Sequence, residues 1–189
     1  MSLIPAFEFG FWNAWILILP VIIASMFGAK ILSKRKSGES ASFSLKVKAV
    51  TFLYFLIELF SYAYSVFSPL KLNTIWFIVG LLIYVPFFCF LIIGLLNFAA
   101  TPVNDLVTKG AYSISRNPSY VSDVLVKTSI GIACLSWIFL LIAVMDFVLL
   151  RTIVVAEERV LLERYGTTYR NYLTRTPRWI GIPKSREKE

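Results

Sequence analysis

Residues 120–155 read YVSDVLVKTSIGIACLSWIFLLIAVMDFVLLRTIVV, and this apolar stretch decides the topology of the chain. As one helix it would be about 54 Å long, whereas the hydrocarbon core of a bilayer is about 30 Å thick. The same stretch can instead form two shorter helices that turn near Cys134–Trp137. The basic residues on either side of it decide between these alternatives, because loops rich in Lys and Arg stay in the cytoplasm.

Basic residues are concentrated in two parts of the chain. The segment Lys30–Lys48 carries six of them and one acidic residue, Glu39, so we predict that it is cytoplasmic. Nine more follow Leu150. A single helix over 120–155 would place these nine outside, whereas a hairpin places them inside, and the sequence therefore predicts the hairpin.

Three further apolar runs precede the hairpin. They are Phe11–Ala29, Ala49–Pro69 and Leu72–Asn104, the last ending as a helix near Asn97–Pro102. The predicted fold is thus all-α, with five transmembrane helices and a cytoplasmic C-terminal helix, the N-terminus outside and the C-terminus in the cytoplasm. Within one structural domain, we expect residues 1–98 to form a three-span region and residues 99–189 to bind a cofactor.

The composition agrees with a small integral membrane protein and excludes several kinds of chemistry. Of 189 residues, 58% are hydrophobic and 16% are charged, with a formal net charge of +8. The absence of histidine excludes Ser-His-Asp catalysis and His-ligated zinc or haem. Cys89 and Cys134 both lie in apolar runs without a partner at ligand spacing, so no metal site is expected.

Two polar stretches on the predicted cytoplasmic side carry the candidate chemistry. Residues 110–120 read GAYSISRNPSY and lead into the hairpin, and residues 157–178 read EERVLLERYGTTYRNYLTRTPR and follow it. A hairpin returns the chain to the side that it left, so the two stretches can form one shared site.

The two stretches together resemble the isoprenylcysteine carboxyl methyltransferase family, which is similar to the membrane phospholipid N-methyltransferases. The resemblance covers residues 110–183 and rests on G-x-Y-x-x-x-R-N-P-x-Y followed by the paired glutamates and R-x-P-R. Asn117 stands where the family commonly has histidine, and it can form hydrogen bonds but cannot titrate. The resemblance implies a membrane enzyme that transfers a methyl group from S-adenosylmethionine to a lipophilic acceptor.

The resemblance and the chemistry of the cofactor together suggest a role for each candidate residue. Glu157 or Glu158 can accept hydrogen bonds from ribose hydroxyls or from the cofactor's ammonium group, and Arg116 can hold its carboxylate. Aromatic faces suit the adenine ring and the sulfonium. The candidate cofactor-binding residues are Tyr112, Arg116, Asn117, Pro118, Tyr120, Glu157 and Glu158.

Other residues are candidates for handling the acceptor. Arg175, in the R-x-P element, is the predicted catalytic residue that orients it, and Tyr169 and Tyr172 are predicted to bind it. Glu58 lies near the middle of an apolar run, where a charge is costly, so it is a second catalytic candidate. Glu58 can equally be a protonated group hydrogen-bonded between helices.

Structural explanations for these charges stay open. The paired glutamates can be a solvated helical turn, and Arg178 can be an anchor for anionic lipid. We expect Asp123 and Lys127 to form an i,i+4 pair, and Asp146 to pair with Arg151 or Lys127.

Several functions stay open as well. The first hypothesis is isoprenylcysteine carboxyl methylation. Phospholipid N-methylation and small-thiol S-methylation are the alternative enzymatic functions. A small transporter or an assembly subunit is the non-enzymatic alternative. The expected partners are membrane lipids and a lipophilic or lipidated acceptor, with no nucleic acid and no metal.

Overall fold

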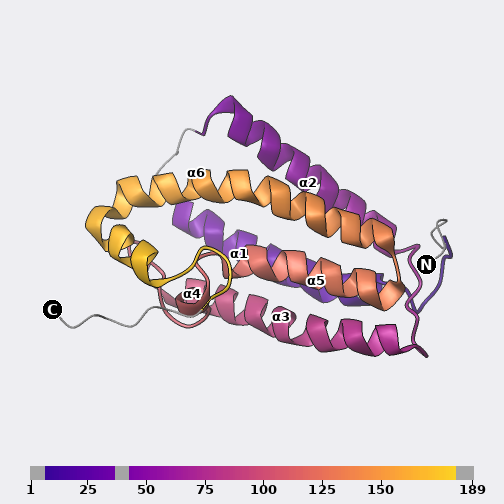
Figure 1. The fold of residues 1–189 in the computed structure, drawn as a ribbon. Coiled ribbons are helices and arrows are strands. Elements are labelled where there is room, and N and C mark those ends of the chain that lie inside the picture. Colours follow the sequence, from indigo (N-terminus) through magenta and orange to yellow (C-terminus); the bar gives the residue numbers. More distant parts are fainter. Residues whose placement is uncertain (1–6, 37–42, 182–189) are drawn as a thin grey trace.

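The chain forms a bundle of long helices, shown in Figure 1. The structure is a computed structural model, and it describes residues 7–36 and 43–181. In this part of the chain every regular element is a helix. The helices are α1 (Trp15–Lys36), α2 (Leu45–Ser65), α3 (Ile75–Ala100), α4 (Ala111–Ile114), α5 (Pro118–Cys134) and α6 (Trp137–Arg175).

Four of these helices are long and apolar enough to cross a membrane, namely α1, α2, α3 and α6. Their outward surfaces carry many exposed Leu, Ile, Val and Phe side chains, as expected of helices that face lipid. α5 has 17 residues, about 25 Å of helix, and is shorter than these four. The prediction of five spans, with α5 as the fourth, therefore stays a prediction.

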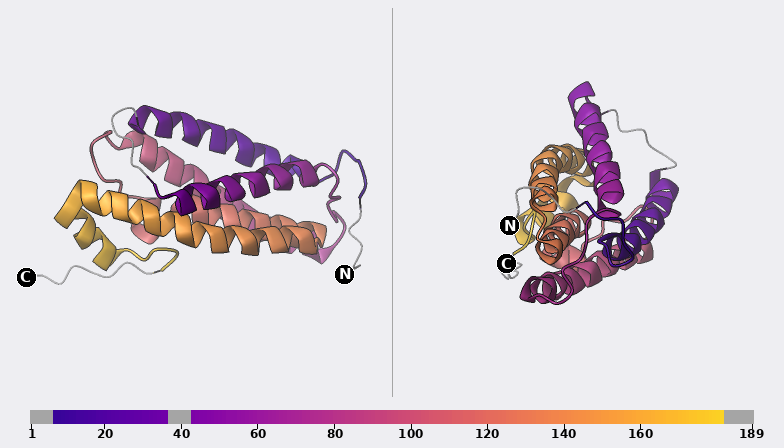
Figure 2. Two further views of the ribbon diagram at one scale, coloured as in Figure 1. Left: turned by 90° about the horizontal axis from the view of Figure 1, so that it is seen from above. Right: turned by 90° about the vertical axis from the view of Figure 1, so that its right-hand side faces the viewer.

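The N-terminal segment, the α2–α3 connection and the α5–α6 turn meet at one end of the bundle (Figures 1 and 2). Backbone hydrogen bonds join them, from Ala14 N to Ser68 O at 2.8 Å and from Lys71 N to Ala133 O at 3.1 Å. The chain reverses at Leu135, which adopts a left-handed conformation with φ 52°. The end of α3, helix α4 and the end of α6 lie at the opposite end of the bundle.

α5 lies between α3 and α6 and touches both closely. A Cβ atom added at Gly80 of α3 would lie 2.7 Å from Ala133 Cβ, and one at Gly131 would lie 2.8 Å from a methyl carbon of Leu140 on α6. Small residues therefore let the three backbones approach, which is a common way of packing helices in a bilayer. This packing fixes the position of α5, which begins in the first candidate motif.

The long helix of the hairpin is followed, after a kink at Gly166, by a second helix at its C-terminal end. α6 runs from Trp137 through the paired glutamates to Arg175, and Gly166 interrupts it with φ 49° and ψ −120°. No glycine or proline occurs between Trp137 and Tyr165, so nothing in the sequence ends the helix before Gly166. The glutamates thus extend directly from the helix that shares the hairpin.

We expect both the C-terminus and the α1–α2 connection to lie in the cytoplasm. The reason is their content of Lys and Arg, together with the common end of the bundle at which α1 finishes, α2 begins and α6 finishes. A reporter fused after Glu189 and a cysteine label introduced at Lys34, in a chain whose own cysteines are replaced by alanine, measure this orientation. An external C-terminus would contradict the predicted orientation.

Candidate functional site

The first motif is docked onto the end of α3. Ala111 N donates to Asn97 Oδ1 at 2.9 Å, and Gly110 has φ 61°, which favours glycine. A Cβ atom on Gly110 would lie 2.1 Å from Asn97 Oδ1. Pro118 begins α5 and packs against Gly94 of α3. Glycine is therefore required at the start of the motif because the chain passes directly over Asn97.

A Gly110→Ala variant is expected to lose about 1–3 kcal/mol of stability, because it adds both backbone strain and a clash with Asn97. Gly166→Ala is a matched control. Gly166 also has positive φ, 49°, but its Cβ would meet nothing within 4 Å. Thermal unfolding in one detergent measures both variants, and equal losses would contradict the role assigned to Asn97.

The C-terminal segment folds back onto the first motif. Arg116 N donates to Pro177 O at 3.0 Å, and Asn117 Nδ2 donates to Arg178 O at 3.1 Å. Ser115 Oγ donates to the same carbonyl at 3.3 Å. The two polar stretches thus lie side by side, and Asn117, at the position of the family's histidine, holds the returning backbone.

Glu158 lies between two arginines, and these three residues are called the arginine–glutamate site below. Arg178 donates to its carboxylate through Nε at 3.1 Å and through a terminal nitrogen at 2.7 Å. A terminal nitrogen of Arg116 lies 3.4 Å from the same carboxylate. The side chains of Arg116 and Glu158 are each 11% exposed, and that of Arg178 is 41% exposed.

The electrostatics of this site leave one donor available. Hydrogen bonding to Glu158 raises the pKa of Arg178 above its ordinary value, so its guanidinium stays charged. Arg116 Nε is buried, and among the described residues it has no hydrogen-bond partner. A buried donor of this kind is costly unless an acceptor is supplied, and a bound anionic group would supply one.

Glu157 has different surroundings from its neighbour in sequence. Tyr120 on α5 donates its hydroxyl to Glu157 Oε1 at 3.0 Å. Consecutive helical residues point about 100° apart, so Glu158 turns toward the arginines while Glu157 turns toward α5. The pair of glutamates therefore divides between two sets of contacts.

Tyrosines of both stretches join the motif to the end of α6. Tyr172 donates its hydroxyl to Tyr112 O at 2.6 Å, and its ring centroid lies 6.0 Å from that of Tyr169. Tyr169 and Tyr172 are both buried, whereas Arg175 is exposed at the end of α6. Contact of these three residues with an acceptor stays a prediction.

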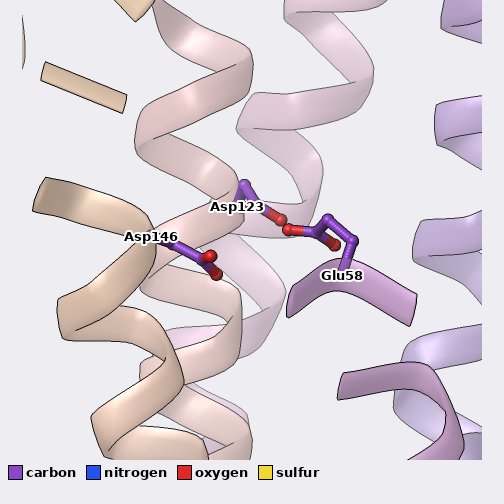
Figure 3. Close-up of side chains that lie close together, drawn as sticks. All are labelled: Glu58, Asp123 and Asp146. Carbon is purple, nitrogen blue, oxygen red and sulfur yellow. The ribbon is translucent and has the colours of Figure 1, made fainter. Parts of the chain in front are cut away.

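A second polar cluster lies among α2, α5 and α6. Lys127 Nζ donates to Asp123 Oδ2 at 2.8 Å, to Asp146 Oδ2 at 2.7 Å and to a carboxylate oxygen of Glu58. Figure 3 shows the three carboxylates converging from the three helices. We call this cluster the carboxylate cage. Lys127 is 2% exposed and Asp146 is fully buried.

The cage explains Glu58 and several of the predicted pairs. The Asp123–Lys127 and Asp146–Lys127 pairs are confirmed. Glu58 is ion-paired with the same lysine rather than lying in the arginine–glutamate site. One oxygen from each carboxylate lies within 4.8 Å of the others, a spacing that can hold a metal ion. Lys127 supplies the cation here, since its three N–H donors match the three carboxylates.

The helices and their composition define a multi-pass, all-helical membrane protein. Residues 75–168 match the family model described as phospholipid methyltransferase. The match covers α3, α4, α5 and α6 as far as Thr168, including residues 110–120 and the paired glutamates, and it ends before Arg175. No curated protein and no solved structure matches the chain. Most of the candidate site is thus built from the stretch that matches a methyltransferase family model.

Arg178 is the site residue whose contact the sequence did not reveal. Arg178 is 20 residues from Glu158 in the sequence. Helical spacing relates residues three or four apart, so it does not predict a contact between residues this distant. The position of Arg178 directly after Pro177 was the available signal, because the proline ends α6 and turns the chain back.

Proposed function

We propose that this protein is a membrane methyltransferase that uses S-adenosylmethionine and acts on a phospholipid acceptor. The observation that carries the proposal is the arginine–glutamate site, a carboxylate between two guanidinium groups with one buried donor of Arg116 left over. The amino-acid end of S-adenosylmethionine is a zwitterion. Its carboxylate suits Arg116 and its ammonium suits Glu158, so the residues fit the group.

The remaining residues of the motif support this assignment. When bound, S-adenosylmethionine supplies an activated methyl group. Tyr112 and Tyr120, next to the arginine–glutamate site, offer aromatic faces to a flat base or a cation. The residues of this chain then bind, orient and exclude water, and fixing two reactants in line contributes about 7–11 kcal/mol to catalysis. Such a mechanism does not require histidine.

The name of the matched family supports a phospholipid as the acceptor, and the bundle supports an acceptor that reaches the site through the membrane. An amino-phospholipid, whose amine can accept a methyl group, satisfies both.

Carboxyl methylation of a prenylated cysteine is the second candidate. It is favoured by the motif and by Arg175, which is exposed at the end of α6, where a guanidinium can hold a carboxylate. Comparison of the two acceptors decides between the candidates.

The experiment uses the full chain in nanodiscs. S-adenosylhomocysteine at 100 times its dissociation constant is expected to stabilise the protein by about 2.7 kcal/mol. A radiolabelled methyl donor is then supplied to nanodiscs of phosphatidylethanolamine and phosphatidylcholine, or of phosphatidylcholine with a farnesylcysteine. Label in phosphatidylethanolamine supports the first candidate, label in farnesylcysteine supports the second, and absence of stabilisation contradicts both.

A further inference from the structure

The carboxylate of Glu158 already holds a cation in this structure, and that cation is the guanidinium of Arg178. Arg178 donates to Oε1 through Nε at 3.1 Å and to Oε2 through a terminal nitrogen at 2.7 Å. Arg116 makes the longer contact, with a terminal nitrogen 3.4 Å from Oε1. A planar guanidinium that donates to both oxygens occupies the lone pairs that face it. An ammonium group placed on the same two oxygens therefore competes with Arg178.

The charges of the site form opposite pairs when the cofactor is added, with one cation left over. In the proposed function, Arg116 holds the carboxylate of the cofactor and Glu158 holds its ammonium. The two charges of that amino-acid end cancel each other, so the surplus of one positive charge among the three side chains stays the same. Once the two pairs have formed, the surplus cation is Arg178.

Burial also favours Arg178, and not Arg116, as the residue that gives way. The side chain of Arg178 is 41% exposed, so water can solvate its guanidinium after it leaves the carboxylate. The side chain of Arg116 is 11% exposed, and its buried Nε has no hydrogen-bond partner in the part of the chain that the structure describes. Arg116 thus gains an acceptor from the carboxylate of the ligand, whereas Arg178 loses one to the ammonium.

The backbone around Arg178 is held independently of its side chain. Its carbonyl oxygen accepts from Asn117 Nδ2 at 3.1 Å and from Ser115 Oγ at 3.3 Å. The ring of Trp179, the next residue, lies 5.2 Å from that of Phe147 on α6. These contacts do not involve the guanidinium, so rotation about the side-chain bonds of Arg178 is sufficient to release Glu158.

We infer that Arg178 is an autoinhibitory residue, whose guanidinium occupies the place of the cofactor's ammonium on Glu158 until the cofactor displaces it. The inference rests on the proposed function and deepens it, because S-adenosylmethionine carries the ammonium that competes. In the cofactor-free protein, Arg178 supplies the close cation that a largely buried carboxylate needs. After the reaction, its return to Glu158 favours release of the demethylated product, S-adenosylhomocysteine.

The test measures S-adenosylhomocysteine binding to the full chain in nanodiscs, comparing wild type with Arg178→Gln. Arg170→Gln, which removes an exposed arginine after Gly166 on the same helix, is the matched control. Calorimetry is expected to show that Arg178→Gln binds the ligand about two- to fivefold more tightly, as for loss of a competing ion pair whose arginine is partly exposed. Chase of bound radiolabelled ligand is expected to show dissociation slowed by a similar factor. Arg170→Gln is expected to match wild type in both measurements.

A second ligand separates competition with the ammonium from simple covering of the site. 5′-Methylthioadenosine has the adenosine and thioether of S-adenosylhomocysteine but neither its ammonium nor its carboxylate. Displacement of radiolabelled S-adenosylhomocysteine measures its affinity. Arg178→Gln is expected to produce no gain for this ligand, because nothing in it competes for Glu158.

Two outcomes overturn the inference and leave the proposed function intact. One is unchanged or weaker binding of S-adenosylhomocysteine by Arg178→Gln, and the other is an equal gain for 5′-methylthioadenosine. Arg178→Lys keeps the charge but lacks the planar fork, so a smaller gain is expected, and this variant carries the test if Arg178→Gln does not fold. A wild-type protein that does not bind S-adenosylhomocysteine refutes the proposed function, and this inference with it.

Discussion

A Lys127→Met variant is expected to lose about 3–5 kcal/mol of stability, enough to leave most of the protein molecules unfolded. The side chain of Lys127 is 2% exposed and holds carboxylates from α2, α5 and α6. Methionine fills a similar volume but leaves those carboxylates without a cation inside a helical bundle. Yield of monodisperse protein and the midpoint of thermal unfolding in one detergent measure the loss.

A compensated variant tests whether charge is the cause. Lys127→Met combined with Glu58→Gln, Asp123→Asn and Asp146→Asn removes every formal charge from the cage while keeping its shape. Replacing a complete buried ionic cluster by neutral groups is often close to neutral for stability, so this variant is expected to recover most of the loss. If the Lys127→Met variant alone is as stable as wild type, the cage contributes no net stability.

Glu158→Gln is expected to raise the dissociation constant for S-adenosylhomocysteine about 10- to 150-fold. A charge-assisted hydrogen bond contributes about 1.5–3 kcal/mol, and an amide can neither balance the two guanidinium groups nor attract the ammonium of the ligand. Glu163→Gln, which removes an exposed acid from the same helix, is expected to leave the affinity unchanged. Isothermal titration calorimetry on nanodisc samples measures both.

A variant of Arg178 separates two explanations for weaker binding by Glu158→Gln. Its guanidinium donates twice to Glu158, and its carbonyl accepts from Asn117, so the glutamate also helps to hold the C-terminal segment. Arg178→Gln removes that hold while leaving Glu158 and Arg116 in place. If Arg178→Gln and Glu158→Gln weaken binding equally, the glutamate acts by holding the segment and not by contacting the ligand.

The sequence was sufficient wherever local composition decides the structure. Apolar runs of membrane length predicted helices that the structure shows as α1, α2 and α3, with their ends displaced by up to seven residues. The i,i+4 spacing of Asp123 and Lys127 predicted their pair, because residues four apart on a helix are neighbours. The two polar motifs were recognisable from residue types and order.

The arrangement of the charges was decided by tertiary structure. Glu58 is 69 residues from Lys127, and Arg178 is 20 residues beyond Glu158, so no local period relates the members of either pair. Their contacts depend on how α2, α5 and α6 pack and on how the chain turns back after Pro177. The sequence alone thus determined that this is a helical membrane chain with a methyltransferase-like motif, since burial in lipid demands apolar helices whatever their arrangement. Only the packed bundle decided that Glu158 faces two arginines while Glu157 faces Tyr120, because that choice depends on the rotation of α6 against its neighbours.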